Sequence, residues 1–435
     1  TVALESAAGD DFERDHGSAA VHCGVAGAHG ARTVNSAGQA RLELRNVLGE
    51  LVGVIDSLCG RTDYRYDAVG NLVEVTGIDG TSVRMRYDGA GRRIAMDDPD
   101  KGHWQYAWNG LGELVRQRDA KGQALDYRYD DLGRVIQRLE LRGVDFLADT
   151  SFTVVNTERT VWQNSSTANV YGKAQPLSVT YREGVAGAVL HQRQYRYDEF
   201  GRQAEVLSDI GDRHFSEATT WDRYGRIFQQ FDASGDARGV RHVYNAHGYL
   251  EALREAREGA EGRVYSTILS MSERGRITAW RLGNGVEAFA DFEPASGKLL
   301  KLTAYDATGR ELQELDYGFD SLGNLARRAD RSNGRERVEF FSYDDLSRLV
   351  EVRYEAPDAP ASPDTLRIAY DAAGNVTWKS DVGTYRYGAG AGPHAVTSAG
   401  SAEYRYDANG NQVAGGGRTL EYSVFDKALR ITSGG

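Results

Sequence analysis

The 435-residue sequence is poor in several kinds of residue, and each scarcity excludes a class of protein. Two cysteines, Cys23 and Cys59, are too few for a disulfide framework or a four-cysteine zinc site, and they leave the cellular compartment open. No apolar run approaches the ~18 residues that a membrane-spanning helix needs. Lys and Arg number 52 against 63 Asp and Glu, so the net charge of −11 argues against a basic nucleic-acid surface.

The N-terminus lacks the charged and apolar segments of a signal peptide, and the first residue is Thr1 rather than Met. We therefore interpret the sequence as an excerpt or a processed piece. With 40% hydrophobic and 26% charged residues, the composition is typical of a soluble, ordered chain. Against this background, 51 Gly and 24 Tyr accompany only 7 Pro and 13 Phe. The joint excess of Gly and Tyr indicates a repeated unit that uses both.

A short segment recurs along the sequence. Tyr64–Leu72 (Tyr-Arg-Tyr-Asp-Ala-Val-Gly-Asn-Leu) returns in related form every 21 residues, so that positions 45, 66, 87, 108 and 129 are equivalent. The pair Tyr-Asp occurs eight times, where random placement gives about two. Looser copies begin at Tyr197, Trp221, Tyr244, Phe292, Phe319, Tyr343, Tyr370 and Tyr406.

Each copy predicts two short antiparallel strands and two turns. Tyr66 closes a strand, Asp67 accepts backbone hydrogen bonds at the start of a turn, and Gly70 supplies a positive φ before the chain reverses. Leu72–Thr76 returns as the second strand, and a second turn follows at Asp79-Gly80. Because one hairpin is marginal in water, we expect the units to stack side by side. The predicted fold is all-β: a curved antiparallel sheet with roughly two strands per repeat.

The pattern divides the chain into four parts. Residues 1–40 form an Ala/Gly-rich, poorly patterned N-terminal segment, and residues 41–141 carry regular repeats. Residues 142–190 are predicted to be divergent strands or an insertion within the sheet, and residues 191–435 carry further repeats.

The motif Tyr-Asp-x-x-Gly-[Arg/Asn]-Leu resembles the RHS repeat, also called the YD repeat, over residues 41–435. This family includes bacterial polymorphic toxins, the B and C components of Tc toxins and the animal teneurins. In its bacterial members the repeats form a sheet that spirals into a hollow shell around a toxic C-terminal domain. The resemblance implies structural rather than catalytic roles for the repeated positions, which are Tyr66, Asp67, Gly70, Tyr87, Asp88, Gly91, Trp108, Asn109, Gly112, Tyr129, Asp130, Gly133, Tyr197, Asp198, Gly201, Trp221, Asp222, Gly225, Tyr370, Asp371, Gly374, Tyr406, Asp407 and Gly410.

One departure from the family concerns the self-cleaving core, which in bacterial members follows the repeats and lies next to paired Asp-Pro motifs. This sequence has a single Asp-Pro, Asp98-Pro99, in the second turn of an early repeat. We therefore expect residues 191–435 to end before any self-cleaving core. About a dozen copies are few for a complete shell, so we also expect a part of one.

No local motif predicts a catalytic, cofactor or metal site. The sequence has no Gly-x-Ser-x-Gly elbow, no His-Glu-x-x-His and no phosphate-binding loop, and Gly388–Gly392 is interpreted as a flexible turn. The acids of Asp97–Gly102 lack the acid that ends an EF-hand loop, so we predict a solvated turn. His22, Cys23 and His29 lack ligand spacing, and a disordered tail is the simpler interpretation.

Two functions remain open. The resemblance implies a wall segment of a shell that encloses and helps deliver a C-terminal toxin, secreted or on a bacterial surface, without catalysis or cofactors. Its partners would be the rest of the shell, the toxin domain and a secretion or translocation component, with no nucleic acid and no membrane span. The alternative is an adhesin whose aromatic rows, Trp108 and Trp221 included, bind glycans or proteins. The structural interpretation of these rows is that neighbouring aromatics stack on each other.

Overall fold

The computed structural model describes residues 3–8, 11–14, 21–24, 29–143, 152–163, 174–234, 239–256, 262–334, 336–355 and 365–434. Its N-terminal strands are β1 (Ala3–Ala8), β2 (Asp11–Arg14), β3 (Val21–Gly24) and β4 (His29–Val34). The regular repeats then form β5 (Ala40–Arg45), β6 (Leu51–Ile55), β7 (Arg61–Tyr66), β8 (Leu72–Thr76), β9 (Ser82–Tyr87), β10 (Arg93–Asp98), β11 (Gly102–Trp108), β12 (Leu114–Arg118), β13 (Ala124–Tyr129) and β14 (Val135–Arg142).

Longer strands follow in the divergent part, of which residues 144–151 and 164–173 lie outside the described residues. They are β15 (Thr153–Trp162), β16 (Pro176–Glu183), β17 (Val189–Tyr197), β18 (Gln203–Ile210) and β19 (Arg213–Trp221). The wall continues through β20 (Ile227–Phe231), β21 (Gly239–Tyr244), β22 (Leu250–Ala256), β23 (Val264–Met271), β24 (Ile277–Leu282), β25 (Glu287–Phe292), β26 (Leu299–Tyr305), β27 (Glu311–Phe319), β28 (Leu325–Asp330), the short 3-10 helix η1 (Ser332–Gly334), β29 (Arg337–Tyr343) and β30 (Leu349–Glu355).

The last repeats have shorter strands. These are β31 (Leu366–Tyr370), β32 (Val376–Lys379), β33 (Gly383–Tyr387), β34 (Val396–Ala399), β35 (Ala402–Tyr406), β36 (Gln412–Gly415), β37 (Arg418–Tyr422) and β38 (Ala428–Ser433).

Within the described residues, 36 strands form one antiparallel sheet, and β2 and β3 form a separate hairpin. Every strand from β4 to β38 pairs with the next along the chain, and β1 pairs with β4. The prediction of an all-β, curved antiparallel sheet is therefore confirmed.

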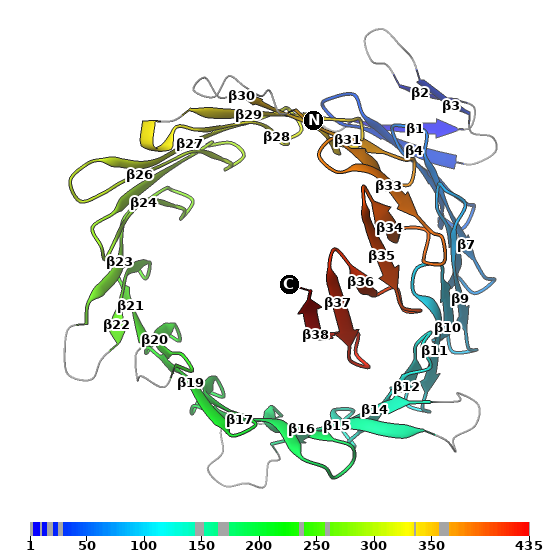
Figure 1. Ribbon diagram of the computed structural model, residues 1–435, viewed down its shortest axis with the longest axis horizontal. Coiled ribbons are helices and arrows are strands. Elements are labelled where there is room, and N and C mark those ends of the chain that lie inside the picture. The colour runs from blue at the N-terminus through cyan, green and yellow to red at the C-terminus, as the bar shows by residue number, and fades with distance from the viewer. Residues whose placement is uncertain are drawn as a thin grey trace.

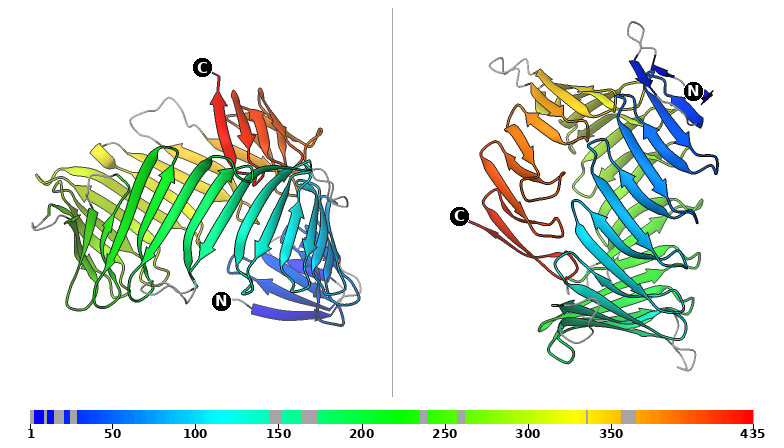
Figure 2. Two further views of the ribbon diagram at one scale, coloured as in Figure 1. Left: turned by 90° about the horizontal axis from the view of Figure 1, so that it is seen from below. Right: turned by 90° about the vertical axis from the view of Figure 1, so that its right-hand side faces the viewer.

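The sheet bends into a ring, and the C-terminal strands fall within its outline when it is viewed along the axis (Figure 1). Figure 2 shows β31–β38 displaced along the axis of the ring, so the sheet winds as a spiral. A register shift falls beside the aromatic residue that ends many hairpins, as at Tyr66, Tyr129 and Tyr197. Because a bulge increases local twist and bends its strand, its repetition at the same edge gives the sheet a consistent curvature.

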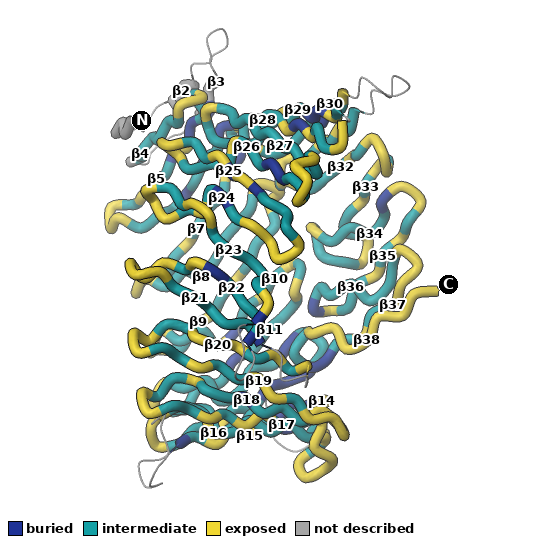
Figure 3. The backbone as a smooth tube through the Cα atoms, turned by 90° about the vertical axis from the view of Figure 1, so that its left-hand side faces the viewer, coloured by how far each residue is buried: buried dark blue, intermediate teal, exposed yellow. Residues whose placement is uncertain are grey.

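The curved sheet is a single layer, so few residues are fully buried. Figure 3 shows buried positions scattered among half-buried and exposed backbone. Two small clusters of buried residues pack within it: one around Leu42 and Leu44, and one of Ala124, Leu139 and Leu141. Stability must therefore come largely from contacts between neighbouring hairpins, as in other repeat arrays. No helix in the described residues is long and apolar enough to cross a membrane.

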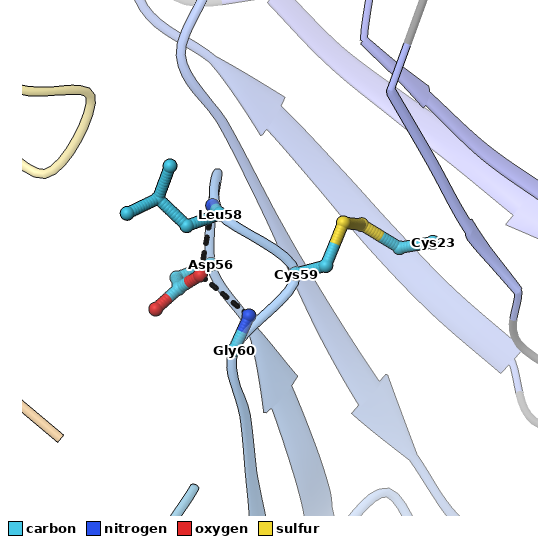
Figure 4. The surroundings of a disulfide bond; sticks show 5 residues. All are labelled: Cys23, Asp56, Leu58, Cys59 and Gly60. Carbon is cyan, nitrogen blue, oxygen red and sulfur yellow. Dashed lines mark hydrogen bonds between the residues drawn. A yellow bond between two sulfur atoms is a disulfide. The ribbon is translucent and has the colours of Figure 1, made fainter. Parts of the chain in front are cut away.

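The two cysteines form a disulfide. Cys23 of β3 is bonded to Cys59, which lies in the turn between β6 and β7 (Figure 4). Cys59 has a φ of 63°, a conformation that the corresponding turn of the next repeat gives to Gly80. The expectation of a disordered tail with a weak ligand set is therefore wrong for Cys23, because this residue lies in a strand and its sulfur is used in the disulfide.

Candidate functional site

Each repeat is built on the turn that follows its aromatic residue, which we call the motif turn. In the turn of Asp130, the Asp130 amide donates to the carbonyl of Arg134 at 3.0 Å, and the Gly133 amide donates to the carbonyl of Asp130. One carboxylate oxygen of Asp130 accepts from the amides of Leu132 and Arg134, and the other accepts from the Arg134 side chain at 2.8 Å. A short acidic side chain is needed here because it satisfies three donors at once.

The same arrangement recurs at the positions that the sequence singles out. Tyr66, Tyr87, Trp108, Tyr129, Tyr197, Trp221, Tyr370 and Tyr406 all end strands. The glycines have φ between 74° and 92°, namely Gly70, Gly91, Gly112, Gly133, Gly201, Gly225, Gly374 and Gly410. The first turn residue accepts the amide four residues on at Asp67, Asp88, Asn109, Asp198, Asp222, Asp371 and Asp407.

The residue after the glycine completes the turn. Asn71 donates to Asp67 at 2.9 Å, and Arg92 donates to Asp88 at 2.7 Å. These side-chain hydrogen bonds hold the pKa of Asp67 and of Asp88 below the usual value of an aspartate. At Asn109 the direction of this side-chain hydrogen bond is reversed, because the first turn residue donates its amide nitrogen to Glu113 at 2.6 Å.

The aromatic side chains connect each repeat to the one before. The Tyr129 hydroxyl donates to the carbonyl of Leu114, the first residue of the return strand of the preceding repeat, at 2.7 Å. The Trp108 indole donates in the same way to the carbonyl of Arg93 at 2.9 Å. Equivalent bonds are made by Trp162, Tyr197, Trp221, Tyr244, Tyr343, Tyr370, Tyr387, Tyr406 and Tyr422.

The turn arginine packs on the aromatic of the next repeat. The Arg134 guanidinium lies 5.2 Å from the ring centre of Trp162, and that of Arg226 lies 4.0 Å from Tyr244. Similar contacts join Arg202 to Trp221, Arg276 to Phe292, Lys298 to Phe319 and Arg348 to Tyr370. One arginine thus pairs with its own aspartate and covers the neighbouring ring.

The interpretation that neighbouring aromatics stack on each other is wrong. Among the described residues, ring contacts between aromatic side chains are limited to His242 with Tyr244 and Phe289 with Tyr305. Equivalent aromatics lie two strands apart, about 10 Å at the usual strand spacing, which exceeds the distance of ring stacking. The long arginine side chain spans this gap.

The aromatic face of the sheet is the inner one. The Arg138 guanidinium of β14 lies 3.5 Å from the ring centre of Phe425, in the turn between β37 and β38. In the axial view this turn lies on the inner side of β14 (Figure 1). Tyr127 is the register partner of Arg138, and Tyr129 lies two residues further along the same strand. Because alternate residues share a face, both tyrosines face the inside of the ring.

An apolar hollow of about 460 Å³ lies over β22–β26. Ile268, Trp280, Phe292 and Leu302 line it. Phe292 occupies the repeated aromatic position and carries the contact with Arg276, so this hollow is on the inner face. Alanines at Ala288 and Ala290, the register partners of Trp280 and Leu302, leave the space open.

The two edges of the sheet meet after one revolution. We call the edge with the motif turns the motif edge, and the edge with the other turns the return edge. Five residues of the return edge bond to residues of the motif edge that lie 285–294 positions further along the chain. The pairs are Ser36 with Ser321, Ser57 with Asp345, Asp100 with His394, Lys121 with Asp407, and Asp119 with Asn409. This offset of 285–294 residues corresponds to one turn of the spiral, and we call the contact the seam.

Charged and amide groups hold the seam together. Asn409 donates to the buried Asp119 at 2.7 Å and to Asp426 at 3.0 Å. The Lys121 ammonium lies 2.8 Å from Asp407, and burial raises the pKa of Asp119. At the other end, His394 bonds to Asp100 at 2.6 Å through its ring, which raises the pKa of His394.

The acidic side chains of Asp97–Gly102, the candidate calcium ligands, interact with other groups of the chain. Asp98 accepts from the amides of Asp100 and Lys101, Asp97 pairs with His103, and Asp100 pairs with His394. In the part of the chain that the structure describes, no group of three or more His, Cys, Asp or Glu side chains is arranged to hold a metal ion.

Comparisons with known proteins agree with this architecture. The model of the RHS repeat family matches residues 66–103 and 108–143. Among solved structures, a TcdB2-TccC3-Cdc42 crystal structure has a TM-score of 0.72 at 17% identity, with 93% of this chain and 23% of that chain covered. TcdB2-TccC3 gives 0.66 at 16% identity, with 97% and 25% covered.

A Photorhabdus luminescens Tc holotoxin pore gives a TM-score of 0.54 at 14% identity, with 99% of this chain and 28% of that chain covered. The chain thus spans about a quarter of the length of these structures. None of the curated proteins matches it by sequence.

Proposed function

Because this chain is an RHS-repeat protein, we propose that it forms part of the wall of a hollow shell that encloses a polypeptide, and that it carries out no catalysis of its own. The seam is the observation that carries the proposal. A sheet that returns to its own edge after about 290 residues, and bonds there, surrounds a space rather than a core.

The inner face supports a polypeptide as the content of that space. It carries the aromatic and arginine side chains of the repeats, together with the apolar hollow of Trp280 and Phe292. Such a surface suits apolar side chains of an incompletely folded chain. Viewed along the axis, the C-terminus lies within the outline of the ring (Figure 1), and it lies beyond one rim (Figure 2), so a segment fused after it would start at the mouth of the enclosed space.

The likeness to TcdB2-TccC3 and to a Tc holotoxin pore suggests the kind of content. We propose a toxin polypeptide, carried by a shell that is secreted or held on a bacterial surface. The rest of the shell and a component for secretion or translocation would be further partners.

Crosslinking from the two faces of the wall tests the proposal. A photo-reactive residue replaces Trp280, which lines the inner hollow, in a chain with an unfolded polypeptide fused after the C-terminus. The matched control replaces Phe289, which lies next to Ala288 and Ala290 on β25 and therefore on the other face. We expect the fused segment to crosslink at position 280 only. Equal crosslinking at both positions, or none at position 280, would contradict enclosure.

A further inference from the structure

The tips of the motif turns carry a row of exposed apolar side chains. At the second residue after the turn-starting Asp or Asn stand Leu48, Val69, Leu111, Leu132, Phe200 and Tyr224, which are 66–85% exposed. We call these six residues the tip row. Exposed apolar residues are ordinary when they occur singly, but these share one position in the repeat. Neighbouring repeats lie two strands, about 10 Å, apart, so the row consists of three adjacent pairs along the motif edge: Leu48 with Val69, Leu111 with Leu132, and Phe200 with Tyr224.

Side chains at the same turn position are less exposed where the motif edge contacts the return edge. Leu322 and Leu346 are half-buried, and Asn409 is buried. Each lies in a turn that bonds to the first revolution, through Ser321 or Asp345 in the first two cases and through Asn409 itself in the third. The tip row is therefore the same surface without the return edge that covers it one revolution later.

A return edge that is also uncovered exists in this chain. Val185 lies in the turn after β16, and Ile210 ends β18 where the chain turns into β19. Both side chains are more than half exposed. The turns of these hairpins lie on the same edge as Ser36 and Ser57, whose turns receive the second revolution. The chain thus presents both halves of a seam with no partner among its described residues.

We propose that the tip row is a docking edge for the return edge of a second copy of this chain, stacked along the spiral axis. The contact would repeat the seam between molecules, with apolar tips packed over the turns of Val185 and Ile210. Because the two surfaces differ, the contact is head to tail and adds copies in one direction. This inference rests on the proposed function, because the two copies would join through the same two edges that form the seam. It does not require that a polypeptide be enclosed.

Sedimentation velocity of the 435-residue chain over a range of concentrations tests the docking edge. We expect wild type to self-associate, and Leu48→Ser/Val69→Ser/Leu111→Ser/Leu132→Ser to weaken this association at least about tenfold. Val185→Ser/Ile210→Ser should weaken it similarly, because it alters the other half of the contact. Circular dichroism would verify that each variant keeps its strand content.

The matched control changes exposed apolar residues elsewhere. Leu429→Ser/Ile431→Ser alters β38, which pairs only with β37 among the described residues, and should leave the association unchanged. Loss of association in this control would assign it to strand addition at β38 and overturn the proposal. A wild type that stays monomeric, or that binds anionic lipid vesicles through the tip row instead, would also overturn it. The crosslinking from position 280 is independent of all these outcomes, so failure here is distinguishable from failure of the wall function.

Discussion

Asn409→Ala probes the seam at its most enclosed point. Asn409 is 6% exposed and donates to Asp119, which is 4% exposed, and to Asp426. Removing the amide leaves the Asp119 carboxylate short of a donor in a buried place, next to the charge of Asp426. An unsatisfied buried polar group costs about 1–3 kcal/mol, so we expect a loss of this size from the free energy that holds the seam closed.

The control is His247→Ala, which changes the same turn position where the motif edge is uncovered and lies outside the tip row. This side chain is exposed, so its removal should change the free energy of unfolding by less than about 0.5 kcal/mol. Hydrogen exchange of the 402–422 backbone is the direct assay, because opening of the seam releases this segment before the whole sheet unfolds. Urea denaturation gives the global value.

The pH dependence adds a second signature. Burial raises the pKa of Asp119, so its ionised form is penalised in the closed seam and its protonated form is not. The deficit of Asn409→Ala should therefore be largest at neutral pH and shrink as the pH falls and Asp119 takes up a proton. Equal exchange rates in Asn409→Ala and wild type at pH 7 would refute the assignment of the seam.

Three further predictions concern the repeat and the other end of the seam. Gly70→Val should cost about 2 kcal/mol and lower the melting temperature, because Gly70 has a φ of 90° and a β-branched residue resists that conformation. Gly110→Val, at a turn glycine with open space around it, should change little, and equal effects would reject the turn assignment. Tyr129→Phe should cost about 1 kcal/mol in urea denaturation, since it removes only the hydroxyl bond to Leu114; an unchanged midpoint would show that this tie is not made. The raised pKa of His394 means that its bond to Asp100 contributes fully below pH 6.5 and is lost as the pH rises through the raised value. The protection factors of residues 388–399, which correct exchange rates for their intrinsic pH dependence, should therefore be higher at pH 6 than at pH 8. His394→Gln should remove this difference, and a difference that persists would assign it to another group.

The local architecture could be predicted from the sequence because it depends on neighbours. Asp67, Gly70 and Leu72 fall within one hairpin, and their chemistry specifies the turn and the return strand without reference to distant residues. The 21-residue period then implies the antiparallel sheet. The pair Tyr305-Asp306 shows the limit of this reasoning, because its turn has the same sequence pattern but follows β26 on the return edge.

The seam could not be predicted, because it depends on curvature summed over a whole revolution. A small change in twist per repeat would place Ser57 beside another turn than that of Asp345. The Cys23–Cys59 bond joins a poorly patterned segment to a turn position that Gly occupies in the next repeat, and two cysteines alone carried no such signal. The arginine contacts were missed because the motif places Arg134 28 residues before Trp162, although both lie on the same face.

Cryo-electron microscopy of the chain with an unfolded polypeptide fused after its C-terminus tests the central claim most directly. The account predicts a wall one sheet thick, closed by the seam of Asp119 and Asn409, with additional density for the fused segment inside the ring. A filled interior in the unfused chain, or fused density confined to the outside of the wall, would contradict it.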